Sequence, residues 1–193
     1  MQTLTRKDLM SLEKYAEERP AFRARVMAHK RDRQVAIGAH ATLYFEDRLT
    51  IQYQIQEMLR IEKIFEARDI EEELNAYNPL IPDGANWKAT FMLEYEDVAE
   101  RRTALARLSG VATRVYVRVA DRPRVYALAD EDMGRENDDK TSSVHFLRFD
   151  LTPELVAAAR GGAMIACGID HPAYQGETIL MEAQRTALLA DLA

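Results

Sequence analysis

Three side chains that bind metals or exchange protons stand in the second half of the chain: His145, Asp170 and His171. Pro172 disfavours the α region for the residue before it, so His171 is expected in extended backbone at the end of the apolar run AMIACGI. If the strands that carry His145 and His171 are neighbours, as consecutive strand–helix–strand elements often are, the two imidazoles and the carboxylate converge. Such a cluster would suit a divalent metal or an acid–base pair.

Each of these side chains also has a purely structural interpretation. His145 can be a half-buried histidine with one hydrogen bond, and Asp170 can accept backbone N–H groups in a loop cap. A divalent metal prefers three or more convergent ligands, which two histidines do not supply. His145 and His171 are therefore candidate metal ligands, and Asp170 is a candidate residue of a ligand or partner face.

A second group of candidates is formed by Tyr53, Glu57 and Arg60, which follow one another at i, i+4 and i+7. This spacing places them on one side of a helix. The group is either a solvated helix face with one ion pair or a polar stripe that faces a cleft or a partner.

The elements that position these residues follow from apolar periodicity and turn residues. A helix is predicted over 5–18, and Pro20 is expected to end it and to open a second helix. The strongest helical pattern covers 48–67. Shorter patterns predict helices over 69–77, 97–110 and 152–160, strands over 89–96, 115–119, 143–150 and 163–169, and a last strand and helix that end near residue 189.

These elements predict a single α+β domain over residues 1–193, with a helical N-terminal arm over 1–33. Its strands are expected to form one mixed, largely antiparallel sheet with helices on one face. The stretch DEDMGRENDD, residues 130–139, has no apolar period and is expected to be a loop.

Composition excludes several functions. The net charge of -6 argues against nucleic-acid binding through bulk electrostatics. Cys167 is the one cysteine, so an intrachain disulfide and a cysteine-ligated zinc or iron–sulfur site are excluded for this chain alone. The first residues lack the apolar core of a signal peptide, and no run of apolar residues is long enough to span a membrane, so a cytoplasmic protein is expected.

Five motifs carry a resemblance: YQIQEMLRIEKI, NPLIPDG, KATFMLE, DKTSSVHFLRF and GIDHPAY. In this order they resemble an uncharacterised bacterial family, known as a domain of unknown function, over nearly the whole chain. Members of that family tend to be encoded beside rubrerythrin-like non-haem iron proteins and an iron–sulfur oxidoreductase. The resemblance implies an accessory role in redox or peroxide handling. Because the chain has one cysteine, it does not hold the iron–sulfur cluster, and no redox centre of its own is expected.

Three functions remain open. The first is a cytoplasmic accessory protein that docks on a rubrerythrin-like or iron–sulfur partner and needs no cofactor. The alternative is a metal-binding protein or metal-dependent enzyme that holds a divalent metal with His145, Asp170 and His171, with His40 or Glu57 as a further ligand. The third is an anion or nucleotide binder that uses the cluster at 31–33 and Lys140, although dinucleotide, nucleoside-triphosphate and acyl-nucleophile motifs are all absent.

Overall fold

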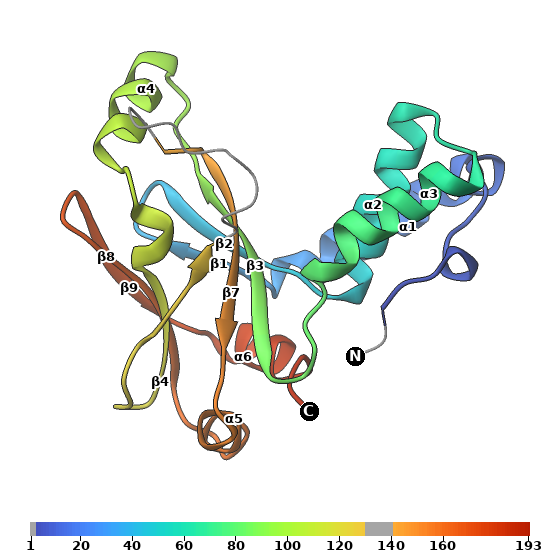
Figure 1. The fold of residues 1–193 in the computed structure, drawn as a ribbon. Helices are drawn as coiled ribbons and strands as arrows, with labels where there is room; N and C mark the ends of the chain where they lie inside the picture. Colours follow the sequence, from blue (N-terminus) through green and yellow to red (C-terminus); the bar gives the residue numbers. More distant parts are fainter. Residues whose placement is uncertain (1–2, 130–140) are drawn as a thin grey trace.

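The helices of the N-terminal part pack on one another beside a body built from two β-sheets (Figure 1). The computed structural model describes residues 3–129 and 141–193. A 3-10 turn, η1 (Arg6–Asp8), precedes α1 (Leu12–Arg31), α2 (Arg48–Glu62) and α3 (Ala67–Tyr77). Aliphatic residues of α2 and α3 form one small core, and aromatic residues of α1 and α2 form a second core.

α1 runs without interruption through Pro20, so the predicted break at this residue is wrong. Pro20 lies on the exposed side of the helix, where water can solvate the carbonyl that loses its intrahelical partner. Tyr15, Phe22 and Val26 are buried and hold both halves of α1 against α2. This packing offsets the cost of a proline in the helix interior.

All strand pairs in the described residues are antiparallel, and the strands form two sheets. The first sheet has the order β1-β2-β3-β7-β6, with β1 Gln34–Ile37, β2 Ala41–Phe45, β3 Asn86–Leu93, β7 Val144–Asp150 and β6 Leu128–Ala129. The second sheet has the order β5-β4-β8-β9, with β5 Val125–Tyr126, β4 Val115–Val119, β8 Ile165–His171 and β9 Tyr174–Ile179.

The main core contains buried side chains from both sheets, such as Phe91 of β3 and Val117 of β4. The segment that carries β5 and β6 passes from one sheet to the other, because β5 pairs with β4 and β6 pairs with β7. On another edge, side chains of β9 bond to carbonyls of β1: Tyr174 Oη donates to Ile37 O at 2.7 Å, and Thr178 Oγ1 donates to Ala36 O at 2.7 Å. These bonds join the edges of the two sheets.

Three further helices and two 3-10 turns complete the described part of the chain. They are η2 (Asn78–Leu80), α4 (Val98–Arg107), η3 (Val111–Arg114), α5 (Pro153–Arg160) and α6 (Glu182–Leu189). None of the helices in residues 3–129 and 141–193 combines the length and apolar character needed to cross a bilayer.

The predicted α+β class is confirmed, while the expected arrangement of its layers changes. The strands form two sheets rather than one, and α1, α2 and α3 pack mainly on one another at the side of the body (Figure 1). The expected helical arm over 1–33 corresponds to η1 and α1, which pack against α2 and α3. The predicted loop over 130–139 and Lys140 lie outside the described residues.

Candidate functional site

The motif GIDHPAY forms the β8–β9 hairpin, and His171 uses both ring nitrogens to hold it in place. Nε2 donates to the backbone oxygen of Ser109 at 3.0 Å, and Nδ1 accepts the backbone N–H of Ala173 at 3.1 Å. The side chain is buried, with 8% exposure. These two bonds fix a neutral ring with its proton on Nε2, so His171 connects the hairpin to the segment before η3.

His145 lies in β7 of the other sheet, so the expected convergence with His171 through neighbouring strands does not occur. Its Nε2 is 3.0 Å from both Thr141 Oγ1 and Ser142 O, and its ring stacks on Phe91. Among the residues that the structure describes, no group of three or more His, Cys, Asp or Glu side chains is placed to hold a metal ion. Metal binding by His145 and His171 stays a prediction.

Asp170 lies on the outer face of the second sheet in a network of charged and aromatic residues. Its Oδ2 accepts Arg124 Nη1 at 2.8 Å and Tyr126 Oη at 2.5 Å, while its Oδ1 is buried and has no hydrogen-bond partner among the described residues. The Arg124 guanidinium lies 4.2 Å from the centre of the Tyr116 ring, and Tyr116 donates to Glu177 at 3.0 Å. These contacts hold the side chains of the network, which are Asp170, Arg124, Tyr126, Tyr116 and Glu177, in fixed relative positions.

Glu57 joins α2 to α1. Its carboxylate accepts hydrogen bonds from Tyr15 Oη at 2.6 Å, from Arg19 Nε at 2.7 Å and from Arg60 Nη2 at 3.1 Å. The Arg19 bond is the largest cause that lowers the pKa of Glu57 to about 2. Tyr53 packs against the rings and aliphatic groups of α1 and α2. Tyr53, Glu57 and Arg60 therefore share one side of α2, as predicted, and Tyr53 and Glu57 contact α1.

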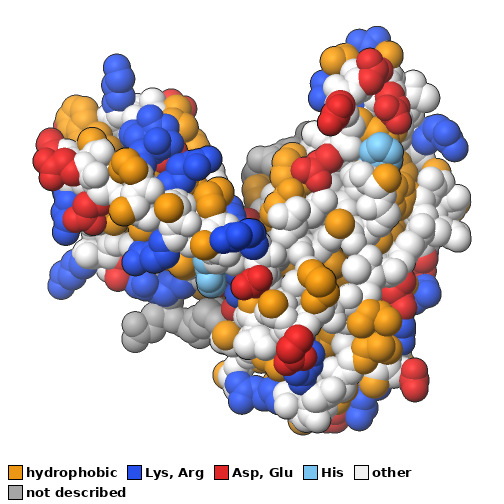
Figure 2. Space-filling view, turned by 180° about the vertical axis from the view of Figure 1, so that it is seen from behind, with side chains coloured by type: hydrophobic (Ala, Val, Ile, Leu, Met, Phe, Trp, Pro, Cys, Tyr) orange, Lys and Arg blue, Asp and Glu red, His pale blue; other side chains and the backbone are white. Residues whose placement is uncertain are grey.

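Basic side chains gather on the helical part of the face shown in Figure 2, but Arg33 is buried. It is 2% exposed, forms an ion pair with Asp191 and lies 3.4 Å from Asp47. His29 Nε2 lies 2.5 Å from Asp47 Oδ2. Burial raises the pKa of Asp191 to about 6, although the Arg33 guanidinium opposes this rise. The cluster ties the C-terminal segment to α1.

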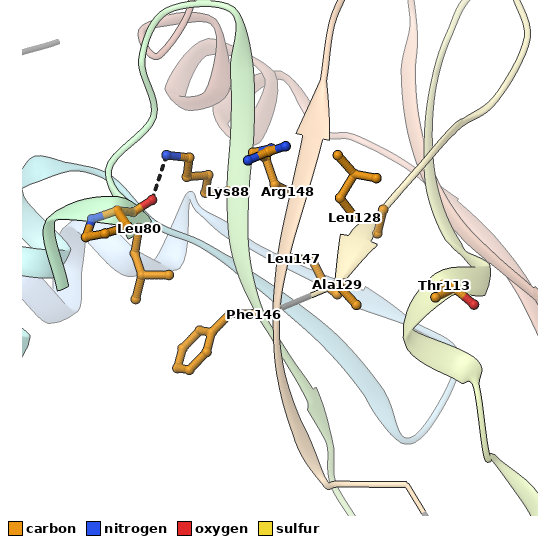
Figure 3. A pocket seen from close by; sticks show the side chains of 10 residues that line it. Leu80, Lys88, Thr113, Leu128, Ala129, Phe146, Leu147 and Arg148 are labelled. Carbon is orange, nitrogen blue, oxygen red and sulfur yellow. Dashed lines mark hydrogen bonds between the residues drawn. The ribbon is translucent and has the colours of Figure 1, made fainter. Parts of the chain in front are cut away.

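A groove of about 500 Å³ crosses the outer face of the first sheet near β7 (Figure 3). It brings together the η2 loop, strands β3, β7 and β6, and the turn η3. Figure 3 shows Lys88 and Arg148 beside each other, with Leu80 and Phe146 on one side and Leu128 on the other. The full lining is Pro79, Leu80, Lys88, Thr113, Ala127, Leu128, Ala129, Phe146, Leu147 and Arg148.

Lys88 and Arg148, the two cations of this β7 groove, are held by hydrogen bonds within the protein and keep further N–H groups that can donate to a ligand. Lys88 Nζ donates to Pro79 O at 2.6 Å and to Ile81 O at 2.8 Å, which leaves one N–H of the ammonium. Burial lowers the pKa of Lys88. Arg148 bonds to Asp150 through Nε, and its terminal amino groups have no partner in the described part of the chain. The groove thus offers N–H groups of both side chains to an anion.

The apolar part of the β7 groove is open to solvent. Leu128 is 52% exposed, and Leu80 and Phe146 are partly exposed. Cations next to exposed apolar side chains suit a ligand with a carboxylate beside an apolar group. One indirect signal for this site is present in the sequence, because the motifs NPLIPDG, KATFMLE and DKTSSVHFLRF all contribute residues to the groove.

Comparisons with known proteins identify a family and a solved structure. A family model described as a protein of unknown function (DUF3501) matches residues 3–192. The crystal structure of a protein of unknown function from Burkholderia pseudomallei K96243 superposes with a TM-score of 0.94 at 50% identity, and the match covers 100% of both chains. No curated protein matches the sequence. The chain therefore belongs to the DUF3501 family.

Proposed function

We propose that this protein is an accessory protein that binds a partner protein through the β7 groove. The partner that we propose is a rubrerythrin-like or iron–sulfur protein of a cytoplasmic, peroxide-handling redox module, which is the context implied by the family resemblance. In this role the protein contributes a docking surface, and the partner contributes the redox centre.

The observation that carries the proposal is the pair of cations next to exposed apolar side chains. Lys88 and Arg148 present N–H groups on the same side of the sheet as Leu128 (Figure 3). Two cations in one groove attract an acidic segment, and apolar side chains next to them contribute contact area that is removed from water. The proposed occupant is therefore an acidic segment of the partner, with an apolar residue beside the carboxylate.

The state of the one thiol supports a role without redox chemistry in this chain. Cys167 is 0% exposed in the core between the two sheets. Burial raises the pKa of this thiol to about 12, so the thiolate that reacts with disulfides or metals is scarce at neutral pH.

The test is the affinity of this protein for purified rubrerythrin-like and iron–sulfur proteins from the same host, measured by calorimetry. Arg148→Glu, at a side chain that is 49% exposed, is expected to weaken binding about tenfold or more. Lys88→Met removes the charge and keeps an aliphatic chain, and it is also expected to weaken the binding of the partner. Arg23→Glu on the exposed side of α1 carries the same change of charge and serves as the control.

Equal losses of affinity in Arg148→Glu and Arg23→Glu would show that binding depends only on the net charge. This result would overturn the β7 groove as the docking surface. The absence of binding to both classes of partner would overturn the proposed redox module.

A further inference from the structure

A second hollow, of about 520 Å³, lies between α4 and the edges of both sheets. It is formed by the β1–β2 turn, the residues that follow β3, one side of α4 and the start of β9. Its lining residues are His40, Tyr95, Ala99, Glu100, Thr103, Ala104, Arg107 and Tyr174. Four of them carry groups that bind ligands, and these groups come from three separate segments of the chain.

The His40 ring is held by a hydrogen bond and by stacking, and its Nε2 stays available to a ligand. Nδ1 donates to the backbone oxygen of Glu94 at 3.0 Å, and the ring stacks on Tyr95 with 4.2 Å between the centroids. The backbone N–H of His40 donates to Tyr174 Oη at 3.1 Å. Because a carbonyl only accepts hydrogen bonds, the neutral ring carries its proton on Nδ1 and keeps a lone pair on Nε2. Within the described residues, Nε2 has no partner.

Three more groups at this hollow make no hydrogen bond within residues 3–129 and 141–193: the Tyr95 hydroxyl, the Glu100 carboxylate and the Arg107 guanidinium. Glu100 and Arg107 are two turns apart on α4 and lie on the same side of it. Burial raises the pKa of Tyr95, and the charges of Glu100 and Arg107 act on the same hydroxyl. The four groups therefore share one space, which is typical of a binding site with a few convergent polar groups.

We infer that this hollow is a binding site for a small molecule that carries an oxyanion, either a carboxylate or a phosphate, together with a hydrogen-bond donor. Arg107 and the Tyr95 hydroxyl donate to the oxyanion, since a guanidinium matches the geometry of both anions. His40 Nε2 and the Glu100 carboxylate accept from the donor of the ligand. This site is separate from the β7 groove and does not depend on the proposed docking function.

The test follows the histidine ring signals of the full chain by NMR during titration with inorganic phosphate and, separately, with acetate. A saturable change is expected at His40, whereas His145 and His171, which are buried and bonded elsewhere, serve as internal references. Arg107→Gln is expected to weaken the binding of the better probe about tenfold or more. Arg102→Gln, at an exposed residue of the same helix, is the matched control and is expected to leave it unchanged.

A saturable response to either probe, lost in Arg107→Gln and kept in Arg102→Gln, supports the site, and the tighter probe identifies the anion. A response that never saturates, that is equal in the two variants, or that appears equally at the reference histidines overturns it. The absence of any response at His40 overturns it as well.

Discussion

Lys88 and Arg148 lie directly opposite each other on β3 and β7, so two cations form one cross-strand pair. Like charges at directly opposed positions destabilise a sheet. Here the ammonium is turned toward two carbonyl oxygens of the 79–81 segment, and Asp150 balances one of the two charges. The charge of Asp83 also acts on Lys88. Lys88 and Arg148 both keep N–H groups that an acidic group of a partner would accept in the β7 groove, and these N–H groups are the physical basis of the proposed docking site.

The apolar part of the β7 groove can be tested apart from its charges. Leu128→Ser removes a large exposed side chain from the groove and is expected to weaken partner binding by about 1 kcal/mol or more with little loss of stability. Ile179→Ser is the matched control, because Ile179 is 55% exposed, against 52% for Leu128, and lies on the other sheet. Equal effects of both variants on affinity would argue against this surface.

Glu57 is expected to be a stability residue. Glu57→Gln removes the charge that accepts bonds from Tyr15, Arg19 and Arg60, and is expected to lower the free energy of unfolding by about 2 kcal/mol at neutral pH. Glu18→Gln, in an exposed pair with Lys14, is the control and is expected to cost less than about 0.5 kcal/mol. Denaturant unfolding measures both.

The pH dependence of the Glu57 contribution has a definite sign. The folded pKa of about 2 lies below the ordinary value of 4.5, so the stabilisation is present above pH 4.5 and is lost as the pH falls toward 2. The gap in stability between the wild type and Glu57→Gln is therefore expected to narrow in acid. A gap that stays constant down to pH 2 would contradict this assignment.

The contribution of Asp191 to stability is expected to depend on pH with the opposite sign. Its folded pKa of about 6 lies above the ordinary 3.8, so the stability that it contributes is present below pH 3.8 and is lost as the pH rises through 6. Asp191→Asn removes this dependence, so from pH 4 to pH 7 the variant is expected to gain about 2 kcal/mol relative to the wild type. Asp121→Asn, at an exposed residue, is the control. Parallel curves for the wild type and Asp191→Asn would refute the role of this carboxyl.

His171 is expected to act through its two hydrogen bonds. His171→Ala is predicted to lower the free energy of unfolding by about 2 kcal/mol, because Ser109 O and the Ala173 N–H lose their partner. Gln175→Ala, exposed in the same hairpin, should have nearly no effect on stability.

Elemental analysis of untagged protein tests whether His171 binds a metal instead. Close to one equivalent of metal, lost in His171→Ala, would favour metal binding over the structural role.

Local patterns predicted much of the secondary structure, and packing decided the exceptions. The apolar stripe over 48–67 predicts a helix, and α2 forms there but ends at Glu62, since Lys63 adopts the left-handed conformation. Pro20 is a helix breaker by local rules, yet α1 continues through it because buried aromatic residues lie on both sides. Helical spacing places Glu57 and Arg60 on one side of α2 but cannot say that this side meets α1.

The groove depends on relations that a single sequence does not contain. The pairing of Lys88 with Arg148 follows from the register of β3 and β7, which are separated by more than fifty residues. The division of the strands into two sheets likewise separates His145 from His171, although the order of elements favoured neighbouring strands. A polar atom that is available to a ligand, such as His40 Nε2, can be identified only when the hydrogen bonds of the surrounding groups are known.

Amide hydrogen exchange, with and without a bound rubrerythrin-like or iron–sulfur partner, tests the docking surface most directly, because it reports protection along the whole chain. Docking in the β7 groove predicts slower exchange in η2, β6 and β7 when the partner binds. Protection confined to β8 and β9 on the other sheet, or to the exposed side of α1, would contradict it.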